Sequence, residues 1–382
     1  MQRRPLMRAG AAALAAALIP AAKAAQDPAP KHAKKPTAAP MAGKPAFRSA
    51  RTEPGPGPGI TTEGELPRIY PTAVTPFWTT GESGDFLSTR GDNVRIRTTR
   101  FLRPGADTAI VISSGRTECM IKYKELIYDL NRNGYSVFIH DHRGQGFSSR
   151  LLANPMIGHV EAFDDYVADL KTFFDDHVKP TGHKRHILLS HSMGGCIASL
   201  YLEQHQRDFD RAVLASPMHQ PDLPVEEASI FAVSALDAVG LGNRTIPGGH
   251  PYDHERAFDR DTNEFTHSHI RWEITWDEFN ASPAARLGSP SMHWVRVAYA
   301  AGRQSQDRAA RIVIPVLLLQ ATADTIVVAS AQNRFAARLN SAHPDSCTVV
   351  RIEDARHELF VESDTYRSPA LDRILAFIKS PA

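Results

Sequence analysis

The chain has 382 residues, of which 42% are hydrophobic and 23% are charged. This composition is ordinary for a globular protein with a sizeable core, and it excludes a fibrous or coiled-coil chain. The formal net charge is only +2, and several basic residues lie in the first forty positions, so the rest of the chain lacks the basic excess of a nucleic-acid-binding protein.

The N-terminus has the three-part pattern of a secretory signal. Arg3, Arg4 and Arg8 precede an Ala- and Leu-rich stretch over 9–22, and Ala22-Lys23-Ala24 supplies the small residues of a cleavage site. We therefore expect residues 1–24 to be a signal peptide and the protein to be exported, either periplasmic or secreted. Two alternatives remain: an uncleaved N-terminal membrane anchor, and a twin-arginine signal, which the paired arginines resemble.

The segment 25–67 is rich in Pro, Ala, Lys and Gly and contains an alternating Pro-Gly run at 54–59. Such a composition suits neither a helix nor a central strand. We therefore predict a disordered linker over 25–67. The remaining residues, 68–382, are expected to form one folded domain, because an α/β core with an insertion can fill that length.

Short apolar runs alternate with longer amphipathic segments in this folded part. The predicted strands cover 108–113, 136–140, 186–190, 211–215, 313–320 and 349–352, and the predicted helices cover 120–133, 163–177, 193–205 and 329–339. The alternation predicts an α/β fold with a doubly wound, mostly parallel sheet, whose ligand crevice lies at the carboxyl ends of the strands. It is lost from about 217 to 302, which predicts an inserted, mainly helical cap over that crevice.

A predicted strand runs into small residues and then into a helix at Ser190-His191-Ser192-Met193-Gly194. This is the context of a nucleophile elbow, in which a serine sits on a strained turn and the residues two before and two after it must be small. Gly194 meets that demand, whereas Ser190 stands where glycine is usual. We predict that Ser192 is the nucleophile; the alternative is an ordinary strand-to-helix turn.

A serine nucleophile needs a histidine base, and that histidine needs an acid to orient it. Asp324 comes just after the predicted strand 313–320, and His357 comes after the predicted strand 349–352. Their order along the chain is the one expected after a serine elbow. Asp354 is the rival acid, although its nearness to His357 in sequence makes the required approach difficult.

An oxyanion also needs backbone donors. We expect these to be the amides of Met193, which follows the nucleophile, and of Arg116, which lies in Ser114-Gly115-Arg116 after the predicted strand 108–113. Gly115 allows the backbone to turn at that point. A plain strand-end turn is the alternative interpretation.

Five segments together resemble one known family: Asp141-His142-Arg143-Gly144-Gln145-Gly146-Phe147-Ser148, Gly158-His159-Val160, His191-Ser192-Met193-Gly194-Gly195, Asp324 and Ala355-Arg356-His357-Glu358-Leu359. This combination is similar to the lysophospholipase and monoacylglycerol lipase family, which also includes serine aminopeptidase-like proteins. The resemblance runs from about 84 to 377 and omits most of the cap. It implies a capped α/β-hydrolase fold over 68–382, no cofactor, and a triad of Ser192, Asp324 and His357. One departure is Ser114, where many relatives have histidine.

The cap is rich in large apolar side chains that are expected to form a substrate pocket. The candidate substrate-binding residues are Phe231, Leu236, Trp272, Trp276 and Phe279, with core packing as the alternative for any one of them. Five cap histidines, at His250, His254, His267, His269 and His293, lack the spacing of a metal site, so we predict no metal. The three cysteines, Cys119, Cys196 and Cys347, define no disulfide framework.

These patterns predict a serine carboxylic ester hydrolase that releases the acyl chain of monoacylglycerols or lysophospholipids through an acyl-enzyme. A peptidase or small-ester esterase on the same triad is an alternative, as is a non-catalytic binding protein with this fold. The expected partners are a small acyl ester or lysolipid and a transiently contacted membrane surface, and no nucleic acid. The oligomeric state stays open.

Overall fold

The computed structural model describes residues 48–49, 59–252 and 257–380. The predicted signal peptide and most of the predicted linker lie outside the described residues. Within them, no helix combines the length and the apolar run that a membrane span requires.

One sheet runs through the domain in the strand order β1-β9-β8-β7-β6-β4-β5-β3-β2. In this order, each strand from β1 through β5 pairs in parallel with the next. At the far edge, β3 pairs antiparallel with β5, and β2 pairs antiparallel with β3. The strands are β1 Arg48–Ser49, β2 Glu82–Leu87, β3 Arg95–Phe101, β4 Thr108–Ser113, β5 Ser136–His140, β6 Arg185–His191, β7 Arg211–Ala215, β8 Val316–Ala321 and β9 Cys347–Ile352. The predicted doubly wound, mostly parallel α/β fold is confirmed.

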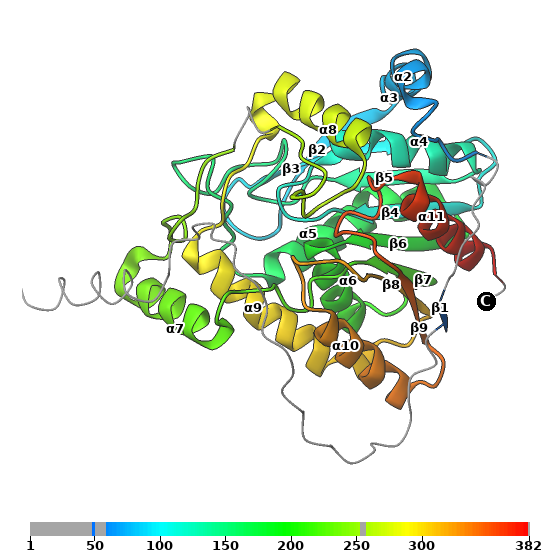
Figure 1. Ribbon diagram of the computed structural model, residues 1–382. Coiled ribbons are helices and arrows are strands. Elements are labelled where there is room, and N and C mark those ends of the chain that lie inside the picture. The colour runs from blue at the N-terminus through cyan, green and yellow to red at the C-terminus, as the bar shows by residue number, and fades with distance from the viewer. Residues whose placement is uncertain (1–47, 50–58, 253–256, 381–382) are drawn as a thin grey trace, which may run out of the picture. The chain divides into compact units, whose positions relative to one another are not determined.

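Helices cover both faces of this sheet, as Figure 1 shows. The α-helices of the described residues are α2 Leu66–Ile69, α3 Thr75–Trp78, α4 Lys124–Arg132, α5 Asp164–Phe173, α6 Met193–Gln204, α7 Glu226–Leu236, α8 His269–Ala281, α9 Met292–Asp307, α10 Ala329–Ala342 and α11 Asp364–Lys379. Successive residues of β4 point to opposite faces, so Val111 joins the core under α5, α6, α9 and α10, whereas Ile112 joins the core under α4 and α11. Burial on both faces explains why the central strands are almost entirely apolar.

Parts of the predicted linker 25–67 belong to the folded domain, since β1 at Arg48–Ser49 pairs with β9 and the residues after Gly59 are packed. Ile60, Thr61 and Leu66 are buried, and the amide of Thr61 donates to Asp129 on α4 over 2.9 Å. Arg367 on α11 donates to the same carboxylate over 2.8 Å. The Pro-Gly run stops at Gly59, and the residues after it have side chains that fill a site between α4 and α11, so the boundary predicted at residue 67 is wrong by several residues.

The insertion after β7 consists of two separate parts. Helix α7 packs on α9, and α9 packs against α6 and α10 as part of the layer that covers the sheet. Helix α8 packs instead on the short helical turn Met120–Tyr123 before α4, and Figure 1 shows α7 and α8 well apart. The predicted cap boundary at 302 falls inside α9, because that helix continues to Asp307. Gly302 lets the helix pass close to the carbonyl of His219.

Candidate active site

Ser192 occupies a tight turn between β6 and α6. Its φ of 51° and ψ of −119° are unusual for a residue with a side chain. The turn is held because the Ser192 amide donates to Ala215 O over 3.0 Å, while its carbonyl accepts the amides of Gly195 and Met218 over 2.9 Å each. Such strain persists where the surrounding structure over-determines it, and here it lifts the hydroxyl clear of the strand.

The residues around Ser192 are small because other backbone segments pass close by. A Cβ at Gly194 would overlap the carbonyl oxygen of Ser113 at the end of β4, and one at Gly195 would lie 2.6 Å from the Pro217 side chain. Ser190, where glycine was expected, has room for its hydroxyl, which donates to Val213 O over 3.0 Å. The turn therefore accommodates serine at position 190, where the hydroxyl group has both space and a hydrogen-bond partner.

The structure brings Ser192, His357 and Asp324 together at the carboxyl ends of three strands. His357 Nε2 lies 2.9 Å from Ser192 Oγ, and His357 Nδ1 lies 2.7 Å from Asp324 Oδ2. The second oxygen of Asp324 accepts the amides of Ile326 and Val327 over 2.8 and 3.2 Å. The carboxylate accepts from Nδ1, which leaves Nε2 as the nitrogen that accepts from the serine hydroxyl.

Asp354, the rival acid, does not contact the imidazole in this arrangement. It is exposed, its backbone has a φ of 58°, and its amide donates to Thr322 Oγ1 over 2.8 Å. The loop between Asp354 and His357 is too short to fold the carboxylate back onto the ring, whereas Asp324 approaches from the neighbouring strand.

Two backbone amides near Ser192 are available as donors. Met193 is the first residue of α6, where amides have no partner within the helix. The amide of Arg116 donates no hydrogen bond within the described part of the chain, whereas the neighbouring Gly115 amide donates to the carboxylate of Glu118. The turn Arg143 to Gly146 braces this loop, since Gln145 Nε2 donates to Gly115 O and Glu118 O over 2.8 Å each.

Glu118 joins the loop after β4 to both other parts of the site. Its carboxylate accepts from Tyr123 Oη at 2.5 Å, Lys122 Nζ at 2.7 Å and His191 Nδ1 at 2.9 Å. His191 precedes the nucleophile, and its Nε2 donates to His357 O over 3.1 Å. Sequence reasoning assigned no role to Glu118 or His191; the only signal was the Glu-to-Lys spacing of four residues at 118 and 122.

The charges of this network stabilise one another. Burial raises the pKa of Glu118, but Lys122 and His191 outweigh it and hold that pKa well below its usual value. Burial lowers the pKa of His191, but the Glu118 carboxylate outweighs it, so the pKa of His191 is raised. Each group therefore favours the charged form of the other, and the two ring nitrogens of His191 link Glu118 in the loop after β4 to the His357 loop.

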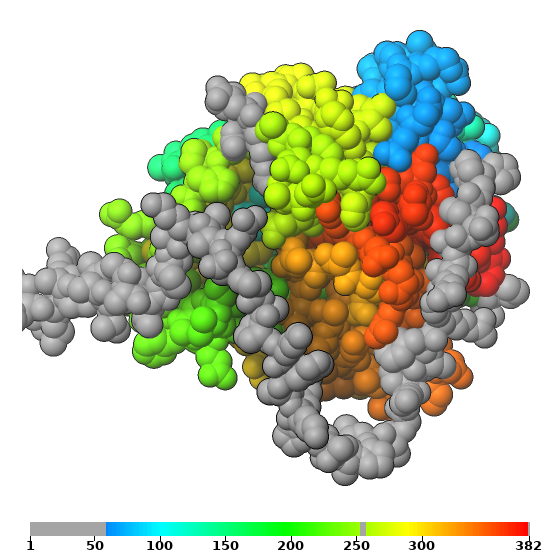
Figure 2. Space-filling view, viewed as in Figure 1, coloured from blue at the N-terminus to red at the C-terminus, as the bar shows by residue number. Residues whose placement is uncertain are grey.

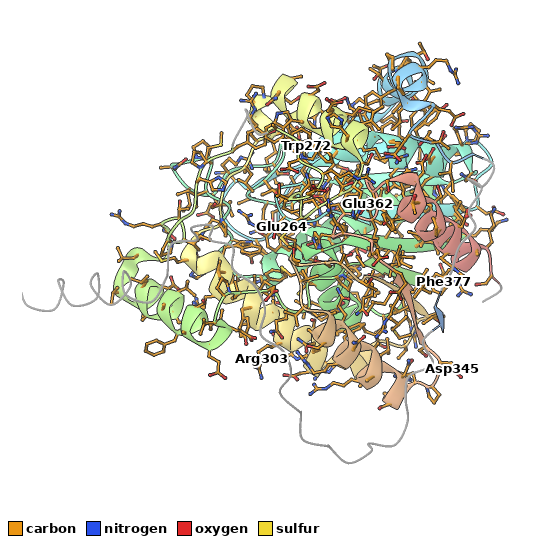
Figure 3. All side chains as sticks on the ribbon, in the orientation of Figure 1. Glu264, Trp272, Arg303, Asp345, Glu362 and Phe377 are labelled. Atoms are coloured by element: carbon orange, nitrogen blue, oxygen red, sulfur yellow. The ribbon has the colours of Figure 1, made fainter. Side chains whose placement is uncertain are left out.

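A cavity of about 360 Å³ lies beside these residues and is bordered by Arg116, Glu118 and Glu358. Its apolar wall comes from α8 and the segment before it. Trp272 and Trp276 stack with their ring centroids 5.0 Å apart, and Tyr252 stacks on Trp276 at 5.1 Å. Phe279 also lines the cavity, and Figure 3 labels Trp272 on α8.

Phe231 and Leu236 do not line this cavity, contrary to the prediction. Both lie on α7, where Phe231 is 67% exposed and Leu236 packs against the core on the α9 side. The cavity wall is α8, which packs on the opposite part of the domain. Grouping all cap aromatics on one face was wrong because the two helices dock on different neighbours.

The segment before α8 is fastened to the loop that carries His357. Thr266 Oγ1 donates to Val361 O over 2.8 Å, and His267 Nδ1 lies 2.7 Å from Glu362 Oε1. Figure 2 shows the yellow-green surface of this segment bordering the orange-red surface of the C-terminal part. The cap histidines are dispersed among carboxylate partners: His269 pairs with Glu273 and His293 with Asp237, while His254 lies outside the described residues.

Comparisons with known proteins agree with this geometry. Residues 104–364 match the family described as serine aminopeptidase, S33. Lysophospholipase L2 of Escherichia coli strain K12 is 36% identical over 307 residues, which cover 80% of this chain and 89% of that protein. Human monoglyceride lipase is 29% identical over 230 residues, covering 59% of this chain and 69% of that protein.

A solved structure of a thermostable carboxyl esterase from Bacillus coagulans superposes with a TM-score of 0.62 at 16% identity, over 78% of this chain and 97% of that one. At this identity the likeness supports the α/β-hydrolase fold alone. The family match covers more than half of the chain, and the Escherichia coli relative is similar along most of its length. The chain therefore belongs to the serine aminopeptidase S33 family of α/β hydrolases, and it is an enzyme of the serine hydrolase class.

Proposed function

We propose that this enzyme hydrolyses the single acyl ester of monoacylglycerols or lysophospholipids, with Ser192 as its nucleophile. The observation that carries the proposal is the hydrogen-bonded series Ser192, His357 and Asp324. An aromatic-walled cavity is bordered by Glu358, the residue that follows His357. Relatives named lysophospholipase and monoglyceride lipase support the lipid assignment.

The reaction proceeds in two balanced halves. Ser192 Oγ attacks the ester carbonyl while His357 Nε2 takes its proton, and His357 then returns that proton to the departing glycerol oxygen, which leaves an acyl-enzyme. Water then attacks the acyl carbonyl while His357 Nε2 takes its proton, and His357 returns that proton to Ser192 Oγ as the bond from Oγ to the acyl group breaks and the fatty acid leaves. Asp324 holds the imidazole tautomer and stabilises the imidazolium formed in each half.

The amides of Met193 and Arg116 stabilise the oxyanion in both halves. A donor of this kind typically lowers the barrier by roughly 3 to 4 kcal/mol. Two observations support the assignment. Neither amide is used by a helix or strand, and Gln145 and Glu118 hold the Arg116 loop from two sides.

The cavity beside the site accepts part of the acyl lipid. Trp272, Trp276 and Phe279 supply apolar surface, and a cavity of 360 Å³ is within the range of small-ligand pockets, roughly 300 to 1,000 Å³. We assign this wall to contacts with the substrate's apolar part. A peptidase would need a charged or polar subsite for a free amino terminus, and the acidic groups at this cavity, Glu118 and Glu358, already bind Lys122.

Export and contact with a membrane surface complete the proposal. The N-terminal sequence has a signal pattern, and α7 with its flanking residues exposes Val225, Phe231 and Val239 to solvent. Exposed apolar side chains on one helix suit transient contact with a lipid surface.

The decisive experiment is a substrate panel with the purified protein. It comprises aryl esters of rising chain length, a monoacylglycerol, a lysophospholipid and an aminoacyl peptide. We expect hydrolysis of the monoacyl lipids and of medium or long esters. Preferential cleavage of the peptide, or activity confined to acetyl esters, would replace the lipid assignment with one of the two alternatives.

A further inference from the structure

Arg116 is a cation at the cavity that lacks a carboxylate partner among the described residues. Its Nη2 donates to Gly288 O over 2.6 Å, and its guanidinium carbon lies 5.2 Å from the centroid of the Trp294 ring. Its Nε–H is buried and has no hydrogen-bond partner within the described part of the chain. Buried charges are normally paired, so this arrangement needs an explanation.

Three buried arginines of the domain show the usual pattern. Arg271 pairs with Glu125 at 3.0 Å and with Asp364 at 2.8 Å. Arg367 pairs with Asp129 at 2.8 Å, and Arg143 pairs with Asp169 at 2.7 Å. Their positive charges are neutralised by these carboxylates, whereas Arg116 has no such partner within the described residues.

Of the two strong bases that border the cavity, Lys122 is paired with carboxylates and Arg116, among the described residues, is not. Lys122, the other strong base on the wall, is bound by Glu118 at 2.7 Å and by Glu358 at 2.6 Å. Burial lowers the pKa of Arg116 to about 10, with no carboxylate to offset it, yet the group stays protonated at neutral pH. Arg116 borders the cavity, so its wall includes one residue whose positive charge no carboxylate of the described residues neutralises.

The guanidinium is also held in place before any ligand arrives. Gly158 lies against it, since a Cβ at that position would be 3.0 Å from Arg116 Nη2, and the Gly288 carbonyl fixes one edge. The segments of Gly158 and Gly288 are themselves joined, because the Gly158 amide donates to Ser289 O over 3.2 Å. The protein thus holds one edge of the guanidinium, and the charge and remaining N–H groups of such a fixed guanidinium suit a phosphate.

We propose that the Arg116 side chain binds the phosphate of a glycerophosphodiester head group, which makes lysophospholipids the preferred substrates over monoacylglycerols. This inference rests on the proposed function, because it names which monoacyl lipid the site selects. In a lysophospholipid the phosphate lies only a few bonds from the scissile ester, along the glycerol. The backbone amide of Arg116 is the proposed oxyanion donor, so its side chain starts within reach of that phosphate.

The first test compares Arg116→Gln and Arg116→Lys with wild type on two substrates of the same acyl chain, a lysophosphatidylethanolamine and a monoacylglycerol. The measured quantity is the ratio of the two kcat/KM values. We expect Arg116→Gln to lower this ratio about tenfold to a hundredfold, as for a lost charged hydrogen bond, and Arg116→Lys to recover part of it. An unchanged ratio in Arg116→Gln overturns the proposal.

Arg303→Gln is the matched control, because it removes one positive charge from an exposed position on α9, labelled in Figure 3 away from Trp272. It should leave the ratio unchanged, and an equal drop would show a general charge effect that overturns the proposal. Labelling of Ser192 by a fluorophosphonate probe verifies that each variant is folded and active enough for the ratio to be read.

A second test separates the head-group site from the lipid assignment. Hydrolysis of a butyryl aryl ester is measured with glycerophosphoethanolamine, glycerol or inorganic phosphate as the competitor. We expect glycerophosphoethanolamine to inhibit wild type and to lose about tenfold in potency against Arg116→Gln, with glycerol inert. Such inhibition without hydrolysis of either lipid would disprove the proposed function and keep the phosphate site. Inhibition by inorganic phosphate as strong as by glycerophosphoethanolamine would overturn the head-group assignment.

Discussion

Two regions determine function in different ways: the strand-end site, formed by Ser192, His357 and Asp324 at the carboxyl ends of the strands, and the insertion after β7. At the strand ends, backbone hydrogen bonds and close packing at Gly194 and Gly195 leave Ser192, His357 and Asp324 a single arrangement. In the insertion, α7 and α8 dock on different neighbours, and only α8 reaches the cavity. Changes at the strand ends should therefore abolish reaction with every substrate, whereas changes in the insertion should redistribute preference among substrates.

The largest effect is expected at the nucleophile. Ser192→Ala should lower kcat by a factor on the order of a million, because the members of a triad act as a unit. Thermal unfolding should stay close to wild type, since the alanine keeps the strained turn. A fluorophosphonate probe should label wild type and not the variant; equal labelling of both would remove Ser192 from the mechanism.

The second-largest effect is expected at Asp324, the proposed acid of the triad. Asp324→Asn should lower turnover by about four orders of magnitude, because the amide favours the wrong imidazole tautomer. Asp354→Asn is the matched control and should have little effect, as Asp354 is exposed and does not contact the ring. Steady-state kinetics on one aryl ester measure kcat for both variants. A larger loss in Asp354→Asn than in Asp324→Asn would assign the acid to Asp354.

A substitution at Glu118 tests whether the strand-end site depends on the hydrogen bonds that Glu118 makes to His191 and Lys122. Glu118→Gln should reduce turnover and destabilise the fold by about 3 kcal/mol, since it leaves the buried His191 and Lys122 charges without one partner. The pKa of Glu118 is depressed, so its contribution is present above pH about 4.3 and is lost as pH falls further. The pKa of His191 is raised, so its contribution is present below pH about 6.5 and is lost as pH rises through the raised value.

The stability difference between wild type and Glu118→Gln should consequently be largest between about pH 4.3 and 6.5. Chemical denaturation at several pH values measures it, with Glu353→Gln, an exposed carboxylate, as the control. A difference that does not vary with pH would mean that the two groups are not an ion pair.

The smallest effect concerns the length of the substrate's acyl chain, and it gives the clearest contrast between α7 and α8. Each methylene buried against α8 contributes roughly 0.8 kcal/mol, so kcat/KM should rise about threefold to fourfold per carbon until the cavity is full. Trp276→Ala should flatten this rise while acetyl ester hydrolysis changes little. Phe231→Ala on α7 should leave the rise intact; if instead it flattens the rise as much as Trp276→Ala does, α7 contributes to the acyl pocket.

The contacts of Ser192, His357 and Asp324 could be predicted from the sequence because they depend on local patterns. A strand that ends in small residues around a serine, and polar residues that follow two later strands, point to the same edge of a parallel sheet. The same reasoning selected Asp324 over Asp354, and Trp272, Trp276 and Phe279 among the cap aromatics. It also included Phe231 and Leu236, because composition cannot tell which helix docks on which neighbour.

What the sequence by itself determined is the α/β fold and the order of the strand-end residues, since hydrophobic periodicity and turn chemistry act over short stretches of chain. Only the tertiary structure decided that Thr61 packs into the domain, that Glu118 joins three separate loops, and that Arg116 has no carboxylate partner within the described residues. Each of these depends on which distant side chain lies opposite a buried polar group. That pairing is set by the packing of whole elements, which no local pattern encodes.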